Sequence, residues 1–125
     1  MNKIIFVDSC IIIDYINGKL SMDTKNIDKY CFNSIVDMEI LAGVKNKRDL
    51  HTTNKKLNLF KTIDIDQEVL TLARNLMNSY TLSHDMGIYD AIIAATCLVY
   101  DLPLWTYNKK DFRFIEELEL INEKN

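Results

Sequence analysis

A short apolar run near the start of the chain, Lys3–Val7, ends abruptly at an acidic residue, Asp8. The run is rich in β-branched side chains, and its apolar positions follow one another without polar alternation, which is the pattern of a strand buried on both faces. Such strands lie in the interior of parallel sheets, between two layers of helices. The run therefore predicts an α/β fold with a carboxylate at the end of a central strand.

Strand and helix patterns alternate along the rest of the chain. The further strands that we expect are Tyr30–Ser34, Thr62–Ile65, Pro103–Thr106 and Leu118–Ile121. The expected helices are Ser9–Ile16, a short turn from Asp23 or Thr24, a helix capped by Ser34 with Asp37 completing a capping box, Lys45–Phe60, Asp66 to about Tyr80, and Gly87–Asp101. This order predicts a three-layer α/β/α fold with a central parallel sheet of four to five strands.

The length and composition indicate one domain over residues 1–125. Three glycines and one proline leave no linker-like segment, and the chain has no apolar run of the roughly 20 residues that span a membrane. The N-terminal apolar run meets Asp8 too early for a signal peptide. The three cysteines lack the spacing of a zinc site, so we expect reduced core thiols in a cytoplasmic protein without membrane contact.

The net charge of −3 excludes a uniformly basic nucleic-acid binder, but the basic residues are unevenly distributed. We call one local group of them the basic strip: Lys45, Lys47, Arg48, Lys55, Lys56 and Lys61. A strip of this kind is either a solvated helix face or a surface that follows the phosphates of a polyanion.

Ligands of parallel α/β sheets bind beyond the carboxyl ends of the strands, and acidic residues collect there in this sequence. Asp8 directly follows the first strand, and Glu39 lies in the opening turns of the helix after the second. Asp111 lies in the loop after the strand Pro103–Thr106. Asp90 opens the preceding helix, which rises about 16 Å away from this edge before the strand returns a similar length. All four carboxylates are therefore expected at one edge.

Four carboxylates in one cleft cannot all stay ionised unless protons are taken up or a cation binds. Oxygen ligands without nearby Cys or His suit Mg²⁺ or Mn²⁺ better than zinc. A site of this kind would hydrolyse phosphodiesters with a water activated by the metal. Ser9, Thr106 and Asn108 would add short hydrogen-bonding groups that orient waters or carboxylates.

Four segments of the chain carry a family resemblance: Phe6–Cys10, Ser34–Gly43, Tyr89–Thr96 and Thr106–Phe112. They resemble the PIN-domain family of small metal-dependent ribonucleases, and within it the VapC-type toxins of bacterial toxin–antitoxin pairs. The family's acidic residues fall on the same four carboxylates, and its hydroxyl and amide residues fall on Thr106 and Asn108. Ser9 and Cys10 stand where the family more usually has Thr and Asn, and Ser9 keeps a hydroxyl.

The resemblance implies a PIN-like fold and cleavage of RNA to a 5′-phosphate and a 3′-hydroxyl. It also implies a homodimer and a cognate antitoxin whose tail occludes the cleft. The candidate catalytic residues are Asp8, Ser9, Glu39, Asp90, Thr106, Asn108 and Asp111, and the four acids among them are the candidate ligands of Mg²⁺ or Mn²⁺.

Other interpretations remain open at this point. One is a PIN-like nuclease that processes RNA, or cuts DNA, without an antitoxin, and another is a non-catalytic RNA-binding protein of the same fold. A phosphoacceptor receiver domain has a similar length and element order. That class needs a second acid directly after the first strand's acid, where Ser9 stands.

Overall fold

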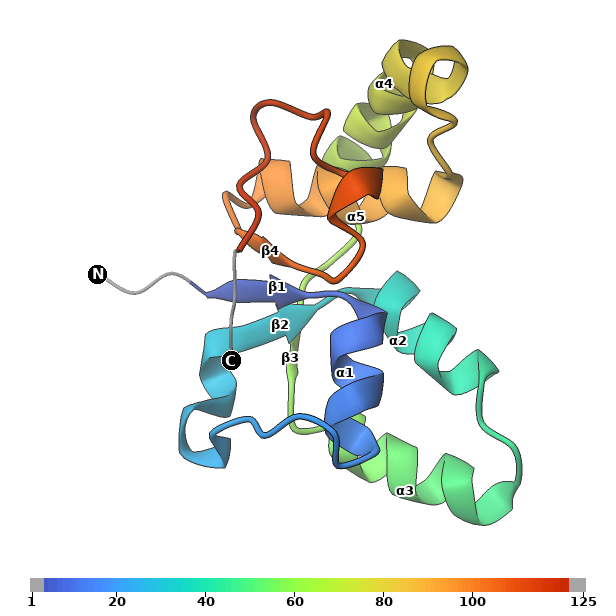
Figure 1. Ribbon diagram of the computed structural model, residues 1–125, viewed down its shortest axis with the longest axis vertical. Helices are drawn as coiled ribbons and strands as arrows, with labels where there is room; N and C mark the ends of the chain where they lie inside the picture. Colours follow the sequence, from blue (N-terminus) through green and yellow to red (C-terminus); the bar gives the residue numbers. More distant parts are fainter. Residues whose placement is uncertain (1–3, 122–125) are drawn as a thin grey trace.

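The computed structural model, which describes residues 4–121, contains one parallel sheet with the strand order β3-β2-β1-β4 (Figure 1). The strands are β1 (Ile5–Val7), β2 (Tyr30–Phe32), β3 (Lys61–Thr62) and β4 (Leu104–Trp105). β1 pairs with β2 on one side and with β4 on the other, and Phe6 lies opposite both Cys31 and Leu104. Phe6 and Val7 are fully buried, so the expected central strand is confirmed.

Helices cover the sheet in the predicted three-layer arrangement. They are α1 (Ser9–Ile16), η1 (Thr24–Lys29), α2 (Ser34–Ala42), α3 (Lys47–Leu57), α4 (Gln67–His84), α5 (Ile88–Val99) and η2 (Lys109–Asp111), where η marks a 3₁₀ helix. In Figure 1, α4 and α5 lie above the strands, and α1 and α3 lie below them. None of the helices within residues 4–121 is long and apolar enough to span a membrane.

Most strand and helix limits differ from the expected ones by one to three residues. β3 covers Lys61–Thr62 and shares only Thr62 with the expected strand, because it lies at the edge of the sheet and pairs with β2 alone. The expected strand Leu118–Ile121 makes a single parallel bridge between Leu104 and Leu120 instead of a regular ladder. α4 continues past Tyr80 to His84, after which Asp85 takes a left-handed conformation that ends the helix.

The expected cap of α2 is wrong by one residue. Asn33, which is fully buried, is the N-cap, and its side-chain oxygen accepts hydrogen bonds of 3.1 and 3.2 Å from two backbone N–H groups of the first turn. Ser34 lies inside the helix and is exposed, so Asp37 completes no capping box. The Asn33 amide also donates to the Thr96 hydroxyl at 3.0 Å, which ties the start of α2 to α5. This second bond explains why a buried amide, and not the adjacent serine, begins the helix.

We predict that Asn33→Ala lowers the free energy of unfolding by about 2 kcal/mol, because it removes both a helix cap and a buried hydrogen bond. Asn46→Ala is the matched control: Asn46 caps α3 at the exposed surface and accepts only one bond, from the Asp49 N–H. We expect it to cost about 1 kcal/mol. Urea unfolding of both variants measures the difference, and equal losses would contradict the role given to the bond between Asn33 and Thr96.

Candidate active site at the carboxyl edge of the sheet

The carboxyl ends of the strands face one side of the molecule, on the right in Figure 1, where α1 and α2 begin and the start of α5 lies nearby. Asp8 is the N-cap of α1 at the end of β1. Glu39 lies on α2, Asp90 in the first turn of α5 and Asp111 in η2 after β4. All four acids therefore come from elements that start at the edge expected from the sequence.

The Asp8 carboxylate is held in one orientation at a buried position. It is 6% exposed, and its two oxygens accept hydrogen bonds from the Ser9 backbone N–H at 2.8 Å and from the Thr106 hydroxyl at 2.7 Å. The Thr106 oxygen in turn accepts from the Asn108 backbone N–H at 3.0 Å. These bonds join the ends of β1 and β4. Thr106 thus lies where the sequence placed it, whereas Asn108 contributes its main chain to this chain of bonds.

The pKa values of Asp90 and Glu39 are raised by burial and by the charges of neighbouring acids. The pKa of Asp90 is raised to about 6, chiefly by burial and in addition by the charges of Asp111, Asp8 and Glu39. Burial and then the charge of Asp8 raise the pKa of Glu39, while a hydrogen bond from the Ser9 side chain lowers it. The Glu39 oxygen Oε1 is buried and has no hydrogen-bond partner. The charges of Asp8, Glu39 and Asp111 thus act on Asp90, while the assignment of these four acids to one site stays a prediction.

Metal binding by these acids stays a prediction. Within residues 4–121, no three His, Cys, Asp or Glu side chains stand close enough to hold a metal ion in their present positions. Like charges repel one another when no cation lies between them. The chemistry of the donors nevertheless fits a hard cation, because the site offers carboxylate oxygens and one of them, Glu39 Oε1, is buried without a partner.

Cys10 is half-buried and packs against the core, as the sequence analysis expected, but it also borders the candidate site. Its sulfur lies 3.8 Å from the Thr106 hydroxyl oxygen and 4.0 Å from an Asp8 carboxylate oxygen. Burial raises the pKa of this thiol, so it stays protonated beside the acids. Its position two residues after Asp8, in the first turn of α1, is the signal that could have identified it. Cys31 and Cys97 are buried as expected.

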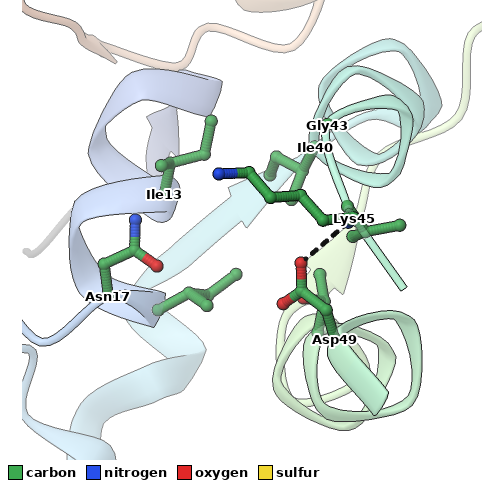
Figure 2. A pocket seen from close by; sticks show the side chains of 9 residues that line it. Ile13, Asn17, Ile40, Gly43, Lys45 and Asp49 are labelled. Carbon is green, nitrogen blue, oxygen red and sulfur yellow. Dashed lines mark hydrogen bonds between the residues drawn. The ribbon is translucent and has the colours of Figure 1, made fainter. Parts of the chain in front are cut away.

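A groove runs between the second half of α1, the end of α2 and α3 (Figure 2). Ile13 and Ile40 supply apolar walls, and the Lys45 side chain extends across the groove toward Ile13. The Asp49 carboxylate accepts a bond of 3.1 Å from the Lys45 backbone N–H. Most of the basic strip lies on α3 at the far side of this groove, where Lys56 donates to a carbonyl of α1 at 3.2 Å. That the basic strip follows the phosphates of a polyanion stays a prediction.

Comparison with known proteins gives consistent matches over the whole fold. The family model described as PIN domain matches residues 5–118. Ribonuclease VapC of Rickettsia bellii is 32% identical over 126 aligned residues, which cover 94% of each chain. A toxin–antitoxin complex from Klebsiella pneumoniae contains a chain with a TM-score of 0.72 and 25% identity, with coverage of 91% of this chain and 94% of that one.

A further solved structure, VapBC2 from Rickettsia felis bound to a DNA fragment from its promoter, supports the fold alone. Its TM-score is 0.78 at 20% identity, and the match covers 95% of this chain and 98% of that one. The element order and the three layers found here are therefore those of a known architecture.

The raised pKa of Asp90 predicts how the stability of the metal-free protein changes with pH. The native state holds this proton up to about pH 6, whereas an unfolded carboxyl loses it near its ordinary value of 3.8, so stability falls as the pH rises from about 4 to 6. Asp90→Asn removes this loss. We expect it to raise the free energy of unfolding at pH 7.5 by about 1 kcal/mol, a figure reduced for partial exposure to water, and to have little effect at pH 4.

Urea unfolding in chelator at the two pH values measures this effect. Asp28→Asn is the control, because Asp28 is exposed on η1 and should show no pH-dependent difference. A gain from Asp90→Asn that is equal at pH 4 and pH 7.5 would contradict the electrostatic explanation.

Proposed function

The chain belongs to the PIN domain family, and on that premise we propose that it is a metal-dependent endoribonuclease of the VapC kind, the toxin of a type II toxin–antitoxin pair. The observation that carries the proposal is the gathering of four mutually repelling carboxylates at the carboxyl edge of the sheet. The similarity of the chain to a ribonuclease VapC supports RNA as the substrate. The three free cysteines accord with a reducing cytoplasm as the place of action.

Asp8, Glu39, Asp90 and Asp111 are the residues that would hold Mg²⁺ or Mn²⁺. A bound cation of this type lowers the pKa of an attacking water and balances the negative charge of the phosphate. The carboxylates supply the counter-charge, and the unpartnered Glu39 Oε1 supplies a free oxygen. The raised pKa of Asp90 supports the same assignment: burial is its main cause and the charges of the other three acids add to it, and a nearby cation would offset both.

The hydrogen-bonding residues keep the acids in place during the reaction. The Thr106 hydroxyl and the Ser9 N–H each donate to a different oxygen of Asp8, so the carboxylate cannot rotate. The Asn108 N–H donates to the Thr106 oxygen, which leaves the hydroxyl proton for Asp8. Ser9 also bonds to Glu39 through its side chain and so links two of the acids. We assign these three residues to positioning the carboxylates and their waters.

We predict that Asp8→Asn and Asp90→Asn each abolish cleavage of RNA, because each removes a charge that would hold the cation. Asp14→Asn is the matched control, since Asp14 lies further along α1 and accepts a bond from the Tyr107 hydroxyl. It should cleave like the wild type. Cleavage of total bacterial RNA with Mg²⁺, Mn²⁺ or chelator measures the effect, and the new ends should carry 5′-phosphate and 3′-hydroxyl groups. Full activity in excess chelator would refute the proposal.

A cognate antitoxin is the proposed protein partner, and the groove between α1, α2 and α3 is the place we assign to it. A solved neighbour of this chain at 25% identity is a toxin–antitoxin complex, which supports a partner of this kind. The groove combines the apolar side chains of Ile13 and Ile40 with a charged rim at Lys45 and Asp49. A segment that orders on binding would lay apolar residues here and extend an Arg or Lys to the carboxylates.

We predict that Ile13→Glu weakens capture of the antitoxin by at least about tenfold while RNA cleavage is unchanged, because it replaces an apolar wall of the groove with a charged side chain that the antitoxin's apolar residues would deprive of water. Leu59→Glu is the control, since Leu59 is 54% exposed and does not line the groove. Growth of bacteria is measured when they express the chain alone and when they also express the candidate antitoxin, which would be encoded by a small reading frame beside the gene of this chain. Rescue that is equal for Ile13→Glu and the wild type would remove the groove from the proposal.

If the wild-type chain is harmless at high expression and yet cleaves RNA, the RNA-processing alternative replaces the toxin.

We also propose a homodimer. The exposed leucines Leu70 and Leu82 of α4 offer apolar surface for a second copy on an element that carries none of the four acids. Sedimentation of the purified chain measures its oligomeric state.

A further inference from the structure

A second hollow lies beside the carboxylates, and no step described so far uses it. Its lining consists of Ile35, Met38, Glu39 and Ala42 of α2 together with Tyr89 of α5. Met38 is 56% exposed and Tyr89 is 58% exposed, although both side chains are large and mostly apolar. Exposed apolar groups that line a hollow mark a binding surface more often than isolated ones do.

Tyr89 connects this hollow directly to the acids. It precedes Asp90 in the first turn of α5, and it also lines an adjoining hollow together with Glu39, Ile88 and Asp90. Glu39 and Tyr89 therefore both line the two hollows. A ligand held at the carboxylates has an exposed aromatic ring within its immediate reach.

We propose that Tyr89 stacks on an unpaired nucleobase next to the phosphate that is cut, with Met38 contacting the same base, so that the hollow is a base subsite of the ribonuclease. The inference rests on the proposed function and extends it to a residue that selects single-stranded RNA. A nucleotide joins a flat apolar ring to a charged phosphate, and the site pairs an aromatic side chain with a cation-binding acidic cluster. Stacking on aromatic side chains is the common way in which proteins hold unpaired bases.

A second copy of the chain fits the hollow less well. A protein surface that covered Tyr89 and Met38 closely would also remove water from Glu39 and Asp90, which line the same two hollows, and Glu39 Oε1 is already buried without a hydrogen-bond partner. Removing more water from these acids without supplying a partner costs further free energy. A nucleotide reaches the ring and leaves the acids to water and the cation.

The test compares three variants on a short single-stranded RNA that the wild type cleaves. Tyr89→Leu should lower kcat/KM by about 5- to 100-fold, whereas Tyr89→Phe, which keeps the ring, should stay within about twofold. Tyr100→Leu is the matched control, because Tyr100 is an exposed tyrosine at the opposite end of α5. It should leave kcat/KM unchanged.

A double-mutant cycle separates stacking from a merely structural effect. The same RNA is made with one abasic nucleotide at each position beside the cut bond. At one of these positions the missing base should slow the wild type by the factor seen for Tyr89→Leu, and it should slow Tyr89→Leu no further. Penalties that multiply at every position would overturn the proposal, as would a Tyr89→Leu variant that cleaves like the wild type.

Three outcomes can be told apart. A fall in sedimenting mass for Tyr89→Leu would make the hollow an interface between copies and would overturn the base subsite. A wild type that neither cleaves nor binds RNA would refute the proposed function, and the subsite with it. A wild type that cleaves, with a Tyr89→Leu variant of equal activity, would refute the subsite alone.

Discussion

Repulsion among four carboxylates at one edge of the sheet is the constraint on which the rest of the structure depends. Charges of one sign move apart unless their backbones are fixed. Here regular secondary structure fixes the backbone of three of the acids. Asp8 caps α1 after the central strand, Asp90 lies in the first turn of α5, and Asp111 is the last residue of η2 after β4. The pKa of Asp90 is raised chiefly by burial, and the charges of Asp111, Asp8 and Glu39 raise it further.

The fold holds the acids through bonds between elements that are far apart in the sequence. The Thr106 hydroxyl joins β4 to Asp8 across 98 positions of the chain. Asn33 joins the start of α2 to Thr96 of α5 across 63 positions. Because α2 carries Glu39 and α5 carries Asp90, this buried amide fixes the relative position of two acids without touching either. Stability and the geometry of the site thus depend on the same few polar contacts.

The sequence was sufficient for features that depend on local pattern. An unbroken apolar run predicted the central strand, and the rise of α5 set against the return of β4 predicted that Asp90 meets Asp8. It was insufficient where two local choices were equally good. Asn33 and Ser34 are both favoured helix caps, and only the packing of Asn33 against Thr96 decides between them. Which side chains border a shared hollow, as Tyr89 and Met38 do, depends on how α2 and α5 pack.

α2 separates the two surfaces to which partners are assigned. Its residues Ile35, Met38, Glu39 and Ala42 follow the spacing of one helical face, and they line the hollow with Tyr89. Ile40 lies on another face and lines the groove against α1 and α3. A protein segment that binds in the groove therefore does not fill the hollow lined by Tyr89 and Met38. If the antitoxin binds this groove as we propose, inhibition would act at the carboxylates of α1, α2 and α5, where a cationic side chain would exclude the metal while the hollow stays open.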